Sequence, residues 1–464
     1  MKSTIISKAI FTLILVCFIM TANAQLVCGD NLLRKQFEMK YPQFLEQVEQ
    51  TFKEARKKSP TRASVYRIPV VFHVVYNNDE ENYSDDLIHD QIAVLNEDFR
   101  RLNANSVDTR EIFEDVAADA EIEFFLAEID PDGNPTTGIT RTFTDKESFI
   151  ELDFAVILQA ALACGIIGYD ITEEQLECLE EQLGDLDLDL DLVKQTSEGG
   201  IDAWDPDNYL NIWSCDLSVD FLGDATPFIL GFAYPPVGAP NWPPEIFPPK
   251  EFEGVVLHYK TVGRNHPNIG ILAGLNDAGR TGTHEVGHFL GLRHIWGDGD
   301  CTMDDGIDDT PTAANNSQTQ DPSNLMCTQA HGKDSCPSDG LPDMVENYMD
   351  YYIESCQNMF TQEQVDLMRA MLEGPRADLV ESTSSSDDIL NISLQITPNP
   401  VNDLMWIKTD IDEDLNCQLV NIEGKVLRTL SLNKANDLTN LGQGVYFVRL
   451  TKENKQRSIR FVKL

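Results

Sequence analysis

Residues 284–294, HEVGHFLGLRH, hold three of the eight histidines in this 464-residue chain and restrict its local fold more than any other segment. His284 and His288 are four residues apart, so a helix places both imidazoles on one face, one turn above the other. Gly291 favours a helix end, because glycine adopts the left-handed backbone conformation at little cost. His294 can then return towards the other two imidazoles, so the spacing predicts that all three meet.

Three neutral imidazoles and a water molecule form an open tetrahedral site, which is typical of catalytic zinc. Glu285 lies beside the histidines, where it can take a proton from that water without binding the ion. A chance match to the full pattern H-E-x-x-H-x-x-G-x-x-H is expected in about 10⁻⁵ of chains of this composition. The sequence therefore predicts a catalytic zinc site, and the other histidines are assigned to core or surface positions: 73, 89, 258, 266 and 331.

The N-terminus is typical of a secretory signal peptide. The apolar run 9–20 is too short to span a bilayer, and the small residues of Ala22-Asn23-Ala24 form a cleavage site. A lipoprotein signal is disfavoured because Val27 precedes Cys28, where a small residue is needed. No later segment is a transmembrane candidate. We expect export through the periplasm to the medium or the cell surface, where disulfides can form.

The formal net charge of −42 excludes several classes of partner. Nucleic acid binding needs a basic face to displace phosphate counterions, so we expect no nucleic acid partner. Anionic membrane surfaces are disfavoured for the same reason. Solubility alone explains such a charge, and aspartate-rich loops can in addition hold calcium.

The chain is long enough for two or three folded units. Strand patterns at 68–76, 122–130, 209–217 and 254–262 alternate with a helix pattern at 84–103 that has Ser84 as its N-cap, which indicates an α/β domain. The predicted order is a signal peptide (1–24), a helical prosegment (25–62), the α/β catalytic domain (63–375), a linker (376–393) and a small all-β sandwich (394–464). Proteolysis near Arg62, in TRAS, would release the prosegment.

Residues 146–196 are interpreted as an insertion in the α/β domain. Cys164 and Cys178 are expected to pair with each other. The segment DLDLDLDL at 185–192 is either a solvated charge run or an edge strand with an acidic face, and the charge run is favoured.

The zinc pattern is the signature of the metzincin metallopeptidases, which also carry a methionine turn that NYMDY at 347–351 resembles. IPVVFHVVY, QIAVLNEDF, YLNIW, DDTP and NYMDYYIESC further resemble the pappalysin (cytophagalysin) family across residues 66–372. The resemblance implies a twisted mixed sheet with an active-site helix, and hydrolysis of peptide bonds in protein or peptide substrates.

The resemblance also implies roles for single residues. Tyr351 would stabilise the oxyanion of the tetrahedral intermediate; the alternative is that Tyr351 is an ordinary core residue. Met349 would pack beneath the metal without binding it. The disulfides would be Cys301–Cys336 and Cys327–Cys356. Calcium would bind in DCTMDDGIDDTP through Asp305, Asp309 and Thr310, with Asp308 a weaker candidate; a solvated turn is the alternative.

Cys28-Gly29-Asp30 resembles the family's prosegment motif, in which a cysteine thiolate caps the zinc and keeps the enzyme latent. The alternative for Cys28 is a disulfide, for example to Cys215. Some family members select a basic residue after the scissile bond through an acid near the methionine turn. Glu354 is the candidate here, but Ser355 directly before the cysteine makes an inherited preference doubtful.

The C-terminal segments TPNPVNDLMWI, NIEGKVL and LGQGVYFVRL resemble the sorting domain of the type IX secretion system, whose machinery would be a partner. A carbohydrate- or protein-binding module is the alternative, and Cys417 stays unassigned. Together these features predict a secreted zinc endopeptidase made as a latent zymogen. The alternatives are a non-catalytic surface adhesin on the same fold, and a narrow amidase or exopeptidase.

Overall fold

The computed structural model of the chain describes residues 27–29, 65–150, 189–221, 224–227, 229–234, 250–318, 326–380, 394–397, 401–409, 416–421, 425–452 and 455–463, with a few isolated positions elsewhere. The chain divides into two units, 1–381 and 382–464, each of which is described by itself. No helix in the described ranges is long and apolar enough to cross a membrane.

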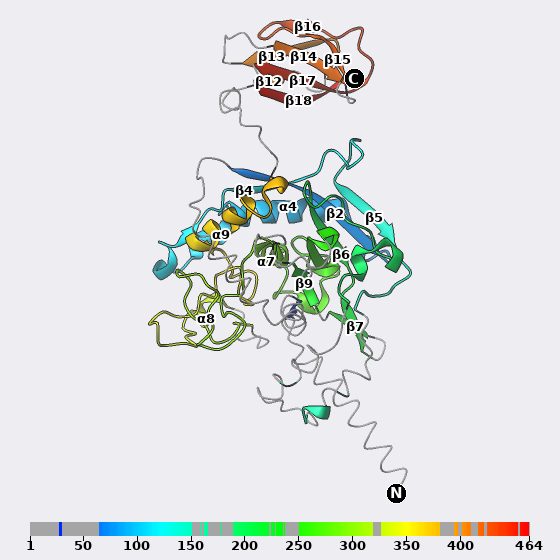
Figure 1. The fold of residues 1–464 in the computed structure, drawn as a ribbon. Helices are drawn as coiled ribbons and strands as arrows, with labels where there is room; N and C mark the ends of the chain where they lie inside the picture. The colour runs from blue at the N-terminus through cyan, green and yellow to red at the C-terminus, as the bar shows by residue number, and fades with distance from the viewer. Residues whose placement is uncertain are drawn as a thin grey trace. The chain divides into compact units, whose positions relative to one another are not determined.

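A seven-stranded mixed sheet forms the frame of the first unit (Figure 1). The strand order is β1-β9-β10-β6-β2-β4, and β5 pairs with β2 beyond the end of β4. All pairs are parallel except β9 with β10. The strands are β1 (Val27–Cys28), β2 (Tyr66–Tyr76), β4 (Ile122–Leu126), β5 (Ile139–Phe143), β6 (Leu210–Cys215), β9 (Ile229–Ala233) and β10 (Val255–His258).

Strand β2 shows why this sheet has a core on both faces. Successive side chains of a strand point to opposite faces. Ile68 and Phe72 are fully buried among the helices on one side, and Val75 is buried with Trp213 on the other. Such a strand is a nearly continuous apolar run, as the sequence predicted for residues 68–76.

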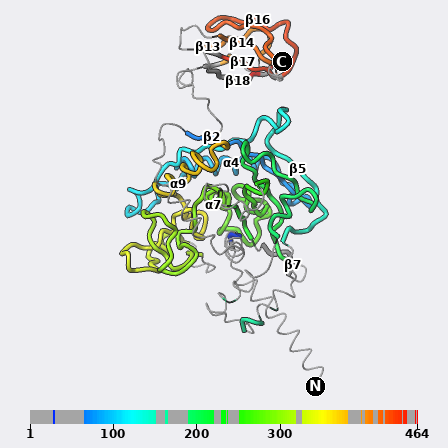
Figure 2. Tube along the Cα trace, in the orientation of Figure 1, coloured from blue at the N-terminus to red at the C-terminus, as the bar shows by residue number. Residues whose placement is uncertain are grey.

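Three helices share the largest core cluster with the sheet: α4 (Asp85–Phe99), α7 (Arg280–Phe289) and α9 (Gln362–Leu372). Helix α7 is buried along its whole length and contacts α4, β9 and β10. Helix α9 begins in a capping box, in which Thr361 and Gln364 satisfy each other's backbone N–H groups. The course of the chain through these helices can be followed in Figure 2.

Smaller elements complete the first unit. They are β3 (Ala117–Ala118), which pairs with β11 (Phe360–Thr361), β7 (Ser218–Phe221), which pairs with β8 (Asp224–Pro227), and α8 (Cys327–Ala330). Short 3-10 helices lie at Ala104–Asp108, Glu111–Phe113, Leu192–Lys194, Thr196–Glu198, Lys250–Phe252, Tyr259–Thr261, Gly270–Leu272 and Ala377–Leu379.

Disulfides tie the strand-poor segment between α7 and α9. Cys301 pairs with Cys336 and Cys327 pairs with Cys356, the same pairs that the family resemblance implies. A third disulfide joins Cys164 to Cys178 in the predicted insertion.

Several sequence predictions differ from the structure. Val27 and Cys28 form strand β1 instead of the start of a helix, because their backbone and the Gly29 N–H form hydrogen bonds with β9. The rest of the predicted prosegment helix lies outside the described residues. Ser84 is at the N-cap of α4, but its side chain makes no capping bond. The predicted strands 122–130 and 254–262 end early, at Leu126 and His258, and a 3-10 helix follows the second.

Two further predictions failed through burial. In the described end of DLDLDLDL, residues 189–192, Leu190 and Leu192 are buried, so that end is neither a solvated charge run nor a strand. Arg376 and Leu379 are buried in the first unit, so the folded part extends past residue 375, where the linker was predicted to start.

The described residues of the second unit form β-strands and the connections between them, as predicted. One sheet contains β12 (Leu394–Thr397), β13 (Leu404–Thr409) and β16 (Ala435–Asp437); the other contains β15 (Val426–Thr429), β14 (Asn416–Asn421), β17 (Gly444–Lys452) and β18 (Lys455–Lys463). Inward-facing residues such as Met405, Leu419 and Val448 form the core between them, and Cys417 is one of its members.

Candidate active site

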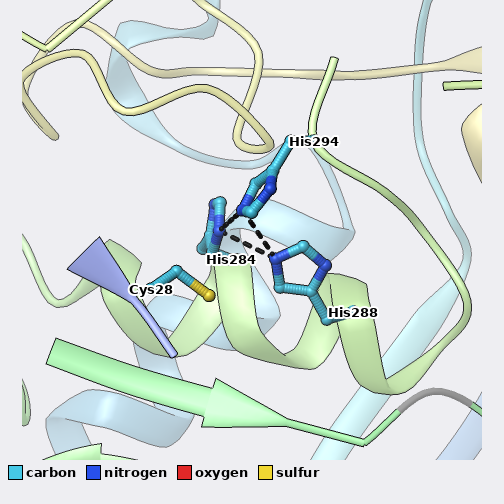
Figure 3. Close-up of side chains that lie close together, drawn as sticks. All are labelled: Cys28, His284, His288 and His294. Atoms are coloured by element: carbon cyan, nitrogen blue, oxygen red, sulfur yellow. Dashed lines mark hydrogen bonds between the residues drawn. The ribbon is translucent and has the colours of Figure 1, made fainter. Parts of the chain in front are cut away.

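Three histidine side chains converge in the first unit (Figure 3). Their Nε2 atoms lie 3.0 Å apart between His288 and His284, 3.1 Å between His288 and His294, and 3.2 Å between His284 and His294. A tetrahedral zinc ion with bonds of about 2.0–2.1 Å holds its nitrogen ligands roughly 3.3–3.4 Å apart. The three nitrogens therefore fit such an ion after a shift of a few tenths of an ångström.

The outer nitrogen of each ring fixes the orientation of that ring. Burial, and then the neighbouring imidazoles, lower the pKa of His284 well below its usual range, so the ring is neutral as a metal ligand must be. When Nδ1 carries the proton and donates it, Nε2 keeps its lone pair for the metal. The Nδ1 acceptors are the carbonyl of Tyr348 for His284 (2.7 Å), the carbonyl of Leu292 for His288 (2.9 Å) and Oδ1 of Asp298 for His294 (2.5 Å).

The end of α7 brings the third histidine back. Leu290 caps the helix, and Gly291 follows in the left-handed region with φ of 97°. Met349 packs directly against α7, because a Cβ at Gly287 would lie only 2.5 Å from its sulfur. Met349 is fully buried, and its contact with α7 agrees with the packing role that the family resemblance implies.

Glu285 is buried next to the histidine cluster. Strand β9 passes so close that a Cβ at Gly231 would lie 2.7 Å from Glu285 Cγ. Tyr351 comes from the methionine turn, and its hydroxyl lies 3.0 Å from His294 Nε2. The Tyr351 hydroxyl therefore reaches the space beside the three nitrogens.

Cys28 enters the cluster from β1 (Figure 3). Its Sγ and the three histidine ligand atoms all lie within 4.8 Å of one another, the one group of this kind among the described residues. Sγ is 3.5 Å from Glu285 Oε2, and the Cys28 N–H donates to the Tyr351 hydroxyl at 3.2 Å. Cys215 is buried elsewhere in the sheet, and no disulfide joins it to Cys28.

A cavity beside the histidines is lined by Thr281, Tyr351, Glu354 and Gln357, among others. The Glu354 carboxylate accepts hydrogen bonds from the backbone and hydroxyl of Thr281 at 2.6 and 2.7 Å, and from Ala278 N–H at 2.8 Å. Burial raises the pKa of Glu354. The side chain lines the cavity, but its oxygens already cap the N-terminus of α7.

The predicted calcium ligands are only partly assembled. The Thr310 hydroxyl lies 3.0 Å from both oxygens of Asp305, whereas Asp309 turns towards α9 and accepts the Glu363 N–H at 3.0 Å. Asp308 donates its N–H to the Glu363 carboxylate. The structure thus brings Asp305 and Thr310 together without Asp309.

The sequence analysis did not identify Asp98, which joins α4 to the active-site helix α7 and to the methionine turn. It is buried in α4 and accepts hydrogen bonds from Thr283 (2.8 Å), Tyr348 (2.7 Å) and Arg280 (3.3 Å). An acid at an apolar position of the helix pattern, directly before Phe99, was the available signal. Asp298 was also missed, and nothing in the histidine pattern indicates it.

Comparisons with known proteins agree with this geometry. A family described as pregnancy-associated plasma protein-A matches residues 195–373, and a secretion system C-terminal sorting domain matches residues 395–463. An extracellular metalloprotease of Arthroderma benhamiae is 33% identical over 224 residues, which are 46% of this chain and 69% of that protein.

Solved structures of mirolysin from Tannerella forsythia are also similar. The mature enzyme in complex with a cleaved peptide is 37% identical, with a TM-score of 0.51, over 69% of this chain and 97% of that one. A promirolysin variant is 34% identical, with a TM-score of 0.57, over 76% and 97%. The mixed sheet with its helices is therefore a metzincin fold. The chain belongs to the pregnancy-associated plasma protein-A (pappalysin) family of metalloendopeptidases, and its type IX sorting domain marks it for secretion or the cell surface.

Proposed function

We propose that this protein is a zinc-dependent endopeptidase made as a latent precursor, with His284, His288 and His294 as zinc ligands. The observation that carries the proposal is the convergence of three Nε2 atoms, 3.0–3.2 Å apart, beside a buried glutamate. Zinc bound there supplies a Lewis acid that polarises a substrate carbonyl and makes water more acidic.

Two side chains would do the remaining chemistry. Glu285 is the general base, which takes a proton from the attacking water and passes it to the leaving amine. Its role is supported by its position in front of the histidines without being part of their cluster. The Tyr351 hydroxyl, 3.0 Å from His294 Nε2, would donate a hydrogen bond to the developing oxyanion.

Strand β9 offers a route for a polypeptide substrate across this site. Residues 27–29 now bond to its edge, with Val27 opposite Ile229 and Gly29 N–H donating to the Gly231 carbonyl at 2.8 Å. Departure of the prosegment would leave those backbone groups unpaired. An extended peptide binds to such an edge by adding a strand, which suits cleavage within a chain.

Latency is proposed to come from Cys28. Its sulfur occupies the place beside Glu285 where the attacking water would lie, and its N–H engages the Tyr351 hydroxyl. A cysteine thiolate is a better zinc ligand than water, so the prosegment would block the metal and both catalytic side chains together.

The Cys28→Ala precursor is expected to be prematurely active, by roughly tenfold or more over the parent, because it lacks the thiolate that blocks the metal; a tenfold change corresponds to about 1.4 kcal/mol. The measurement is cleavage of a quenched fluorescent peptide by uncleaved precursor. Cys28→Ser is the matched control, since it fills nearly the same space with a poor zinc ligand, and we expect it to behave like Ala. If both precursors stay as latent as the parent, the cysteine cap is wrong.

The proposal extends to calcium binding and to the selection of substrate residues. Asp305 and Thr310 lie together as calcium ligands would, and Asp309 would have to turn away from α9 to join them. Glu354 lines the cavity and is kept as a specificity candidate, although α7 already uses its oxygens.

A digestion assay tests the function as a whole. Processed protein is incubated with gelatin and casein, with and without a zinc chelator, and the products are identified by mass spectrometry. We expect internal cleavage that stops with the chelator and returns with zinc. Absence of any turnover would favour the adhesin alternative, and release of terminal residues alone would favour an exopeptidase.

A further inference from the structure

The three histidines are not held in the same way. His284 and His288 donate to backbone carbonyls, which no side-chain substitution removes, whereas His294 donates to the carboxylate of Asp298. This last contact is the shortest of the three, at 2.5 Å. The imidazole of His294 is fully buried, and the Asp298 side chain is only 7% exposed.

From this difference, we propose that Asp298 is a positioning residue that orients His294 and thereby sets the affinity of the site for zinc. The inference rests on the proposed zinc site. A carboxylate hydrogen-bonded to the outer nitrogen makes an imidazole a stronger ligand, and its negative charge offsets part of the charge of a bound cation.

The backbone around Asp298 is shaped for this contact. Gly297 and Asp298 both lie in the left-handed region, with φ of 58° and 57°. A Cβ at Gly297 would lie 2.8 Å from the backbone of Asp304, so only glycine fits there. Asp298 is not a glycine, and its conformation costs on the order of 1 kcal/mol. The turn closes with a hydrogen bond from Gly297 N–H to the His294 carbonyl at 2.9 Å. This turn brings the Asp298 carboxylate back to the ring of His294.

Aromatic rings fix the remaining freedom of His294. The Trp296 ring stacks on it at 4.3 Å with an interplanar angle of 7°, and the Tyr351 ring meets it edge-on at 4.9 Å. Stacking restricts the plane of the ring, but a half-turn about the Cβ–Cγ bond keeps that plane and exchanges the positions of the two ring edges. The hydrogen bond from Nδ1 to the Asp298 carboxylate selects one of these two orientations, so it determines where Nε2 points.

Zinc affinity of the full chain provides the test, with Glu285→Ala in every sample to prevent self-cleavage. Metal-free protein is titrated with zinc against a chromophoric chelator, at a temperature where all variants stay folded without metal. Asp298→Asn keeps the backbone conformation and a neutral acceptor, and Asp298→Gly removes the acceptor without left-handed strain. Asp300→Asn is the matched control, because Asp300 is exposed in the same loop.

We expect Asp298→Asn to bind zinc about 10–100-fold more weakly than the parent, Asp298→Gly more weakly still, and Asp300→Asn equally well. The unfolding temperature of the metal-free protein separates this role from a structural one. If both Asp298 variants bind zinc like the parent, the inference is wrong, whether or not they unfold earlier. If the parent itself fails to bind one zinc, the proposed function fails instead.

Discussion

Replacing Glu285 by alanine is expected to lower peptide-bond hydrolysis by about 10²–10⁴-fold, the usual contribution of a general base, while zinc stays bound. Glu285 is buried and its carboxylate lies 3.5 Å from the cysteine sulfur that fills the front of the site. It is not a member of the group of side chains that could hold a metal ion.

The experiment compares processed parent, Glu285→Ala and Glu285→Gln on one peptide, with zinc content measured by elemental analysis. The glutamine variant keeps the shape of the side chain and removes its basicity, so it should be nearly as inactive as alanine. Glu128→Ala, at an exposed position in the same unit, is the control. Near-parental activity in both Glu285 variants would rule out the general-base role, and zinc loss in both would make the glutamate a structural part of the site.

The histidine pattern could be read from the sequence because its geometry is local. A helix fixes the relative positions of His284 and His288, and Gly291 determines where the helix ends. The sheet strands were predictable for a similar reason, since buried β-branched runs have few other structures available. The ends of those strands were less predictable, as at His258, where a 3-10 turn begins inside an apolar run.

Features that depend on distant partners were not predictable. Nothing in the residues around Cys28 indicates a strand, because β1 exists only through its pairing with β9 about 200 residues away. Leu190 and Leu192 become buried because the fold brings hydrophobic partners from other elements to them, which an alternating acidic pattern does not reveal. The roles of Asp98 and Asp298 likewise depend on which side chains the fold brings to them, and the sequence around each residue does not reveal these contacts.

Replacing Asp98 by alanine is expected to destabilise the first unit by about 3–5 kcal/mol, the usual cost of removing one partner of a buried ion pair. The Asp98 side chain is 1% exposed and faces Arg280, which is 10% exposed. Alanine would also leave the hydroxyls of Thr283 and Tyr348 without their acceptor. Buried donors that lose a partner each add to the cost, because water cannot replace it there.

Asp90→Ala is the matched control for Asp98→Ala. Asp90 lies in the same helix, α4, and pairs with Arg264, but its side chain is 31% exposed and that of Arg264 is 37%. Solvent screens such a pair, so its loss should cost about 0–1 kcal/mol. Chemical denaturation of the parent and the two variants measures both free energies of unfolding. Equal losses in the two variants would show that burial of the Asp98 pair adds nothing to its contribution.

Asp98 also affects the proposed zinc site through Tyr348, whose hydroxyl bonds to Asp98 and whose carbonyl accepts the Nδ1–H of His284. An Asp98→Ala protein that is still folded should therefore release zinc more readily than Asp90→Ala.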